Sequence, residues 1–462
     1  MGWRGKSSKT RTAATEVPAL SRTRSRSSVT SVNRSRAENT ADTAVPVEIW
    51  VDRLELNVKQ TIASRFLLLL SIIVLFGSLT LPIMSHGGEN SEGSEIIRRV
   101  GSAKQLFIDN LLILSAQNVI LKMNPPVKTY ERNIIPDYPW EGLGLSSHNT
   151  LLEDEGIYRM WYGSHLFEDE SEGQPEVLDG EALHTYVYEH LRQYVCYATS
   201  RDGIHWEKPK LGVTPFRGSK QNDIVLTNTT GTVFLDPKKS GGERFKYAGR
   251  IGGGFALWIW ASPDGLRWNQ YLGRPILSRG PFDTQNQVFW DDRIGKYVAY
   301  VRRGGDRINS ADLGNIPYSQ IFELAADPGN LRKIGRSESS DLAHWPEDPK
   351  IVLAYDQDDP VESDHYNPCV IKYPYAPDVY LMFPSAFFHT SKKETGSDGA
   401  LDIQLATSRD GVHWDRRERR PYVRLGIEGS ADGGSMYMTV GMLRQGAELW
   451  MYYTGYQARH GG

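Results

Sequence analysis

A seven-residue motif occurs four times in this chain, and no other feature restricts the fold as strongly. It reads Ser-x-Asp-Gly-x-x-Trp and occupies residues 200–206, 262–268, 339–345 and 408–414, the third copy with Leu in place of Gly. Successive tryptophans stand 62, 77 and 69 residues apart. A unit of this length exceeds most solenoid repeats and suits a four-stranded blade of a β-propeller.

The motif itself predicts a tight turn. Asp-Gly between two apolar runs is typical of a hairpin, because Gly accepts positive φ and the Asp side chain bonds nearby backbone N–H groups. The Ser hydroxyl can bond within the turn, and the Trp can pack on the apolar face. We therefore predict that all four copies are structural and take no part in chemistry.

The segments between the motifs read as strands, four to a repeat. Examples are the apolar runs at 158–164, 193–200, 245–251 and 296–303. The sequence therefore predicts an all-β fold, a five-bladed β-propeller over residues 105–462. A fifth repeat begins at 435–456 but lacks its turn motif, so we expect an incomplete last blade, closed by strands near 106–123 or left short by a truncated sequence.

Three segments precede the predicted propeller. Residues 1–65 form a basic, Ser/Arg-rich arm with the composition of a disordered region, and 85–104 form a polar linker. Between them, residues 66–84 hold 19 residues without a charge, long enough for a transmembrane helix. Basic residues before this stretch and acidic residues after it predict a membrane-anchored protein with the propeller outside the cytoplasm. Secretion after cleavage of a signal peptide is the alternative.

Composition restricts the partners. The net charge of −3 argues against nucleic acid. The two cysteines, Cys196 and Cys369, lie in different repeats and are expected to be buried free thiols. Because neither the cysteines nor the histidines show metal-ligand spacing, we expect no metal and no cofactor.

Functional residues are expected just before the opening strand of each blade, since these positions converge at one end of a propeller's channel. The side chains found there are acidic, amide-bearing or aromatic. They are Glu141, His148 and Asn149 in the first repeat, Asp223 and Asp236 in the second, Asp283, Gln285 and Asn286 in the third, Asp364, His365, Tyr366 and Asn367 in the fourth, and Glu428 and Asp432 before the fifth. The alternative for each Asp is a turn former, and for each His a structural hydrogen-bonding role.

A ring of carboxylates suits the cleavage of a glycosidic bond. One carboxyl group must be protonated to donate to the leaving oxygen, and another must be ionised to attack or to activate water. We predict Asp283, Asp364 and Glu428 as the catalytic set, with the other positions binding an oligo- or polysaccharide. Trp140 and Tyr366 are candidates to stack on a sugar ring.

The repeated turns and the acidic strand starts resemble the five-bladed propellers of the glycoside hydrolase 32/43/68 group, in particular family 32 N-terminal-domain-like proteins exported by bacteria. The resemblance covers about residues 105–462 and implies a glycoside hydrolase, with Asp283 as the middle aspartate and Glu428 or Asp364 as the acid. The family's N-D-P-N-G and R-D-P motifs are missing, and His148-Asn149 stand where the first aspartate is expected. A non-catalytic carbohydrate-binding or assembly propeller is therefore the alternative.

The turns also resemble the Asp-box of sialidases. That likeness adds Arg250, Arg302 and Arg303 as possible members of a carboxylate-binding cluster. Salt bridges between blades are the alternative for all three arginines.

Overall fold

The computed structural model of the chain describes residues 100–102, 104–167, 190–252, 254, 256–278, 280–304, 331–360, 363–389 and 399–460. Apart from two short 3-10 helices, η1 (Pro139–Glu141) and η2 (Gly241–Glu243), the regular secondary structure in these ranges is β. The prediction of an all-β fold is confirmed.

The first three repeats each form one antiparallel sheet. In the second and third sheets the strands follow one another in chain order, whereas in the first sheet the first two strands both pair with the third. The first sheet contains β1 (Gly144–Leu145), β2 (Thr150–Asp154), β3 (Ile157–Phe167), β4 (Leu191–Ser200) and β5 (Ile224–Thr227). The second contains β6 (Thr229–Leu235), β7 (Phe245–Ile251), β8 (Trp258–Ser262) and β9 (Asn269–Gln270). The third contains β10 (Gln287–Asp291), β11 (Lys296–Arg303), β12 (Lys333–Ser339) and β13 (Lys350–Leu353).

The remaining strands form three sheets, one of which joins the fourth and fifth repeats. That joint sheet has the order β14 (Ser363–His365), β17 (Ser385–His389), β18 (Gly399–Ile403), β20 (Ser435–Met438) and β23 (Tyr453–Tyr456). Beside it lie a sheet of β15 (Val370–Lys372), β16 (Tyr380–Met382) and β19 (Ala406–Ser408), and a hairpin of β21 (Leu443–Gln445) and β22 (Glu448–Trp450).

The fourth repeat differs from the prediction of continuous strands. The sequence of this repeat contains two apolar runs that are typical of single strands, at 379–388 and 401–408. The first is broken between β16 and β17, and the second between β18 and β19. Pro384 lies in the first break, where its lack of an N–H prevents it from continuing a ladder. Each run therefore contributes to two sheets, and the short strand β14 has no counterpart in the sequence prediction.

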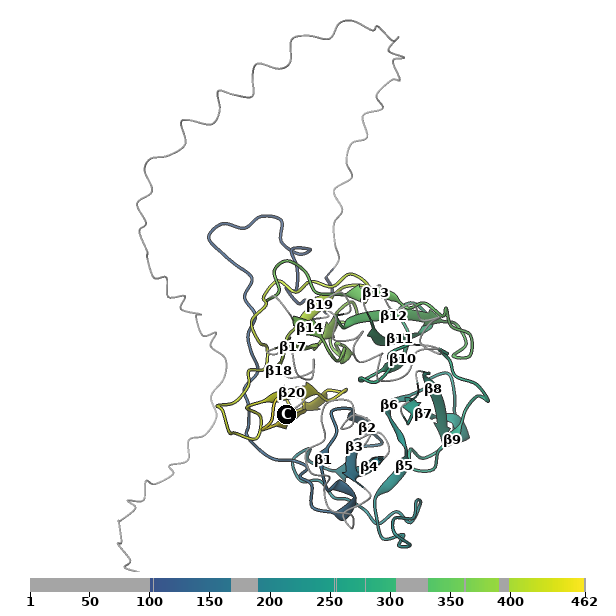
Figure 1. Cartoon of the computed structure of the whole chain (residues 1–462). Coiled ribbons are helices and arrows are strands. Elements are labelled where there is room, and N and C mark those ends of the chain that lie inside the picture. The colour runs from purple at the N-terminus through teal and green to yellow at the C-terminus, as the bar shows by residue number, and fades with distance from the viewer. Residues whose placement is uncertain are drawn as a thin grey trace, which may run out of the picture. The chain divides into compact units, whose positions relative to one another are not determined.

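Consecutive sheets are linked by hydrogen bonds, and the links return to the start of the described β structure. Figure 1 shows the sheets arranged around a common centre. The links are Val233 N to Thr150 Oγ1 (3.0 Å), Thr232 Oγ1 to Asn286 O (2.7 Å), Val370 N to Gln287 Oε1 (2.7 Å) and Leu151 N to Val440 O (2.7 Å). Within the joint sheet, the parallel bridge of Leu401 with Ser435 connects the fourth and fifth repeats. The arrangement is propeller-like.

The four repeated motifs form the same turn, as predicted. In the last copy, Ser408 Oγ accepts a hydrogen bond from Gly411 N (2.9 Å), and Trp414 Nε1 donates to Gly411 O (3.2 Å). The position after the Asp has positive φ in every copy, and this includes Leu342 (φ 66°) in the copy that lacks Gly. Since the polar atoms bond within the turn, these residues serve the fold.

The apolar core lies within and between the sheets. One cluster joins the second and third sheets, where Leu257 and Ile259 pack near Tyr297 and Val301. Cys196 and Cys369 are both buried free thiols, as predicted.

The expectation that strands near 106–123 close the last blade is wrong, because the first strand of the described residues is β1. This segment is instead fixed by polar contacts: Arg409 Nη2 donates to Leu106 O (2.8 Å), and Arg420 Nη2 donates to Met123 O (2.7 Å). No residue of this segment belongs to a strand of the described sheets. The edge strand β23 pairs with β20 without help from this segment.

The predicted transmembrane stretch at 66–84, the arm at 1–65 and most of the linker at 85–104 lie outside the described residues. Among the residues that are described, no helix has the length and apolar character needed to cross a membrane.

Candidate functional site

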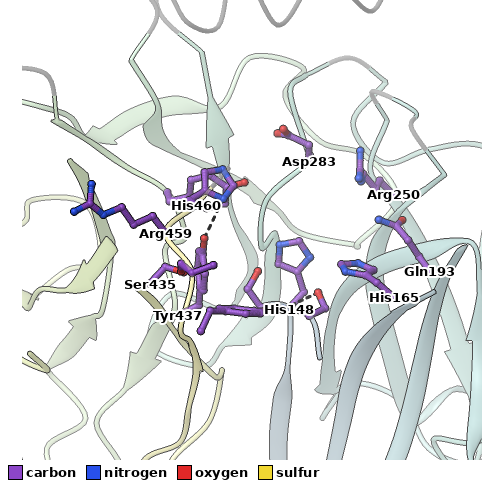
Figure 2. A pocket seen from close by; sticks show the side chains of 14 residues that line it. His148, His165, Gln193, Arg250, Asp283, Ser435, Tyr437, Arg459 and His460 are labelled. Carbon is purple, nitrogen blue, oxygen red and sulfur yellow. Dashed lines mark hydrogen bonds between the residues drawn. The ribbon is translucent and has the colours of Figure 1, made fainter. Parts of the chain in front are cut away.

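A cavity of about 280 Å³ is lined by residues from several sheets and the loops between their strands (Figure 2). Its lining is mostly polar and aromatic: Ser146, Ser147, His148, His165, Gln193, Arg250, Asp283, Tyr366, Ser435, Tyr437, Tyr456, Ala458, Arg459 and His460. Three predicted residues, His148, Asp283 and Tyr366, are among them.

The fold brings these side chains together from five repeats. His148 precedes the opening strand β2, and Asp283 precedes β10, as the sequence argument expected. His165 and Gln193 instead come from the third and fourth strands of the first sheet, where they are direct cross-strand partners. Arg250 lies near the end of β7. Cross-strand partners on one face have neighbouring side chains, which explains how β3 and β4 reach the same wall.

Asp283 is the one carboxylate that lines the cavity among the described residues. It forms an ion pair with Arg302. Burial alone would raise the pKa of Asp283, but the positive charges of Arg302, Arg250 and Arg332 outweigh burial and hold its pKa below the ordinary value. Asp283 is therefore ionised at neutral pH, which suits a base, a nucleophile or a hydrogen-bond acceptor for a sugar hydroxyl.

Asp364 lies behind the cavity wall and is 1% exposed. Arg332 binds its Oδ2 through both the guanidinium and the backbone N–H (3.1 Å each), and His389 Nε2 lies 3.2 Å from the same oxygen. Burial raises the pKa of Asp364, but the charge of Arg332 and the contact with His389 lower it further than burial raises it. The Arg332 guanidinium in turn lies 4.7 Å from the ring centroid of Tyr366, which lines the cavity.

The cavity histidines are held neutral. Burial and the charge of Arg250 lower the pKa of His148 to about 3 and that of His165 to about 4. Burial and Arg332 lower the pKa of His460 to about 4. At neutral pH each ring therefore offers one N–H donor and one acceptor.

Three tyrosines form the aromatic side of the cavity. Tyr366 packs edge-to-face with Tyr437 (5.7 Å between centroids) and with His460 (5.0 Å). Burial raises the pKa values of Tyr366, Tyr437 and Tyr456, so all three keep their hydroxyl protons. Aromatic rings with neutral hydroxyls are suited to pack on a sugar and to bond its hydroxyl groups.

Four predicted binding residues use their side chains in hydrogen bonds with backbone groups at the centre of the propeller-like arrangement of sheets. Gln285 bonds Met438 O (3.2 Å) and Cys369 N (3.2 Å), and Asn367 Oδ1 accepts from Gln285 N (3.1 Å). Asn286 bonds Phe282 O (2.9 Å), and Asn149 accepts from Gly163 N (3.0 Å). None of the four lines the cavity.

Glu141 and Asp236 are buried and do not line the cavity: Glu141 lies in η1, and Asp236 follows β6 and contacts the third sheet. Glu141 accepts from Tyr162 and Lys208 at 2.7 and 2.9 Å, and Asp236 accepts from Tyr297 (2.9 Å). Trp140 is also buried and donates to Asp223 (2.8 Å), so it cannot offer the exposed face for sugar stacking that the sequence suggested.

The structure does not bring the other predicted residues to the cavity lining. Glu428 is exposed in the turn before β20. Asp432 pairs with Lys128 (2.6 Å) and accepts from Tyr453 (2.8 Å). His365 is buried behind the wall, where burial and Arg416 lower its pKa to about 4.

Sequence reasoning missed His165, Gln193, Arg332, Tyr437 and His460. These residues lie in strand interiors or at chain positions away from a blade start, and no local pattern separates them from structural residues. Arg250 and Arg302 were singled out; Arg302 pairs with Asp283, and Arg250 lines the same cavity as Asp283. Arg303 instead pairs with the exposed Asp348 (2.7 Å).

Metal chemistry has no ready ligand set in the part of the chain that is described. No group of three or more His, Cys, Asp or Glu side chains there is placed to hold an ion.

Comparison with known proteins gives partial matches. No family model matches the chain. Two uncharacterised proteins of Mycobacterium tuberculosis, from strains CDC 1551 / Oshkosh and ATCC 25618 / H37Rv, are each 30% identical to it, over 176 and 170 residues. Each match covers 37% of this chain and 44% of the relative, so the matched part spans less than half the length of these relatives.

Solved structures similar to the chain include a glycoside hydrolase (TM-score 0.43, 15% identity, 73% of this chain and 94% of that one). A glycosyl hydrolase from Bacteroides ovatus has a TM-score of 0.43 at 14% identity, over 73% and 92% of the two chains. A β-1,2-mannobiose phosphorylase from Listeria innocua, in complex with β-1,2-mannobiose, has a TM-score of 0.43 at 15% identity, over 68% and 87%.

Proposed function

We propose that this chain is a glycan-active propeller that binds a saccharide in the cavity lined by Asp283 and Tyr366. One observation carries the proposal. An ionised carboxylate, neutral imidazoles and protonated tyrosine hydroxyls face one cavity, so sugar hydroxyls find acceptors and donors beside aromatic rings. Ligand sites of this kind combine apolar walls with a few convergent polar groups.

The blade number belongs to the same proposal. Five blades are supported by the hydrogen-bonded links that pass from sheet to sheet and back to Leu151. The joint sheet of β14, β17, β18, β20 and β23 is then the place where blades four and five share strands.

Glycoside hydrolysis is the more specific function, and the position of Asp283 favours it. An ionised carboxylate in a cavity is one of the two groups that this reaction needs. The second group, a protonated carboxyl at the leaving oxygen, has no counterpart among the described cavity-lining residues, since Asp364 is buried and ionised and Glu428 lies outside. This observation favours the alternative, in which the propeller binds glycans without cleaving them.

Binding and turnover of the full chain on a glycan panel test the proposal. We expect at least one oligosaccharide to bind, and Asp283→Asn to weaken that binding at least tenfold while the far-UV spectrum stays unchanged. The exposed Asp348→Asn is the matched control. Product release by the wild type but not by Asp283→Asn would select hydrolysis, and binding without product would select the non-catalytic function. If no glycan binds, the proposal is overturned.

Membrane anchoring through residues 66–84, with the propeller outside the cytoplasm, stays a proposal that rests on the sequence. Its test is fractionation of cells expressing the full chain, followed by an alkaline carbonate wash. An anchored protein stays in the pellet, and a variant without 66–84 moves to the soluble fraction.

A further inference from the structure

Arg250 stands apart from the other arginines around the cavity. Arg302 pairs with Asp283, and Arg332 pairs with Asp364. Arg250 lines the cavity and is 7% exposed, yet no carboxylate of the described residues lies within ion-pair distance of it. Its described side-chain hydrogen bond is a long one, from Nε to Thr230 Oγ1 (3.4 Å). A buried charge without a partner is costly, so such a group is expected to have an anionic partner when the site is filled.

The neighbours of Arg250 are donors without charge. His148, His165 and Gln193 line the same cavity, and Figure 2 shows His165 and Gln193 on the same side as Arg250, with His148 next to them. Both ring nitrogens of His148 and Nε2 of His165 are buried and have no hydrogen-bond partner among the residues that the structure describes. Polar atoms left in this state await a ligand group that can pair with them.

The charges around the cavity leave one positive charge uncompensated. With histidines counted as neutral, Arg250, Arg302 and Arg332 face Asp283 and Asp364. Arg459 also lines the cavity, but it is exposed and its guanidinium points away from the other side chains (Figure 2). A single uncompensated charge matches a monoanion such as a carboxylate better than a phosphate dianion.

We propose that Arg250, His148, His165 and Gln193 form a subsite for the carboxylate of an acidic sugar, so that the ligand is a glycan containing uronic acid. The inference rests on the proposed function and names its substrate class. The guanidinium fork pairs with the two carboxylate oxygens, a geometry that Arg provides and Lys does not. The imidazole and amide N–H groups complete the coordination of the same oxygens.

Isothermal titration of the full chain tests the subsite. The probes are oligosaccharides of galacturonic and glucuronic acid, each paired with its carboxyl-reduced counterpart, which differs only at the carboxylate. We expect the wild type to bind an acidic form at least tenfold more tightly than its reduced partner. Arg250→Gln should abolish that preference, and Arg250→Lys should keep part of it. The exposed Arg274→Gln is the matched control for charge.

The outcomes separate the two proposals. Equal binding of acidic and reduced forms by the wild type would overturn the subsite and leave the proposed function standing. Binding of inorganic phosphate that depends on Arg250, without a preference for uronates, would overturn the assignment to a sugar carboxylate. If neither form of any saccharide binds, the proposed function fails, and the subsite with it. Thermal unfolding should show that Arg250→Gln is folded under the assay conditions, so that a lost preference reports on the subsite.

Discussion

The guanidinium Nη1 of Arg332 lies 3.1 Å from the Oδ2 of Asp364, and both side chains are almost fully shielded from solvent. The same guanidinium packs against Tyr366 and Phe387. This pair therefore connects a buried carboxylate, taken from the sequence as a catalytic candidate, to an aromatic ring of the cavity wall. Its position supports a role in holding Tyr366 in place.

Replacing Asp364 with Asn should destabilise the protein at neutral pH. The variant leaves Arg332 buried without its anion, and breaking a buried pair typically costs about 3–5 kcal/mol. Because the pKa of Asp364 is lowered on folding, its stabilisation is present above the unfolded pKa of about 4 and is lost as pH falls through the folded value. Urea unfolding from pH 3 to pH 8 should show that the difference in the free energy of unfolding between the wild type and Asp364→Asn becomes smaller in acid. An equal gap at pH 3 and pH 7 would contradict the role of the ion pair.

Replacing Asp402 with Asn should have the opposite dependence on pH. Burial raises the pKa of Asp402 to about 7, and its Oδ1 has no hydrogen-bond partner among the described residues. A raised pKa means that stability is full below the unfolded pKa of about 4 and is lost as pH rises through about 7. We expect the free energy of unfolding of Asp402→Asn to equal that of the wild type near pH 4. At pH 8 it should exceed that of the wild type by roughly 2–4 kcal/mol, because one pKa unit corresponds to about 1.4 kcal/mol. A variant less stable than the wild type at pH 8 would refute this.

The cavity histidines should make the protein labile in mild acid. Their folded pKa values of about 3 to 4 lie below the unfolded value of about 6.5, so their contribution is full above pH 6.5 and falls toward pH 4. His148→Gln should reduce the loss of stability between pH 6.5 and pH 4, by roughly 1–3 kcal/mol. Thermal unfolding across this range measures the effect, with the exposed His413→Gln as the control. An unchanged pH profile would show that His148 is charged or solvated.

The fourth copy of the turn should not tolerate a side chain at its glycine. Gly411 has φ 74°, and an added Cβ would lie 2.8 Å from the Tyr300 hydroxyl, which donates to Gly411 O. Gly411→Ala should cost about 2–3 kcal/mol, from left-handed strain together with the contact. Gly212→Ala has a similar φ of 68° and open space around its Cβ, so it isolates the strain at about 1 kcal/mol. Equal costs in urea unfolding would mean that Tyr300 moves aside.

Local pattern was enough to predict the strands and turns of this fold. The runs at 245–251 and 296–303 match β7 and β11 at both ends, because alternating burial and the turn motif are local signals. The segment at 106–123 shows the limit of this reasoning. It has strand-like composition, but pairing needs a free sheet edge, and Arg409 and Arg420 bind its backbone carbonyls instead.

The sequence predicted cavity residues only at positions close to the opening strand of a blade. His148, Asp283 and Tyr366 were located in this way. Glu141 and Asp236 were grouped with them from the sequence, yet Tyr162 of the first sheet binds Glu141, and Tyr297 of the third sheet binds Asp236. Which side of a strand start faces the channel depends on contacts between repeats, and these leave no mark in the local sequence. His165 and Gln193 were missed for the same reason.

The central claim is tested most directly by a crystal structure of the full chain, from crystals soaked with an oligosaccharide that binds it in solution. The account predicts a sugar ring in the cavity, with a hydroxyl within hydrogen-bond distance of Asp283 and a ring face or edge against Tyr366. A saccharide bound elsewhere on the protein, with the cavity left without sugar, would contradict it.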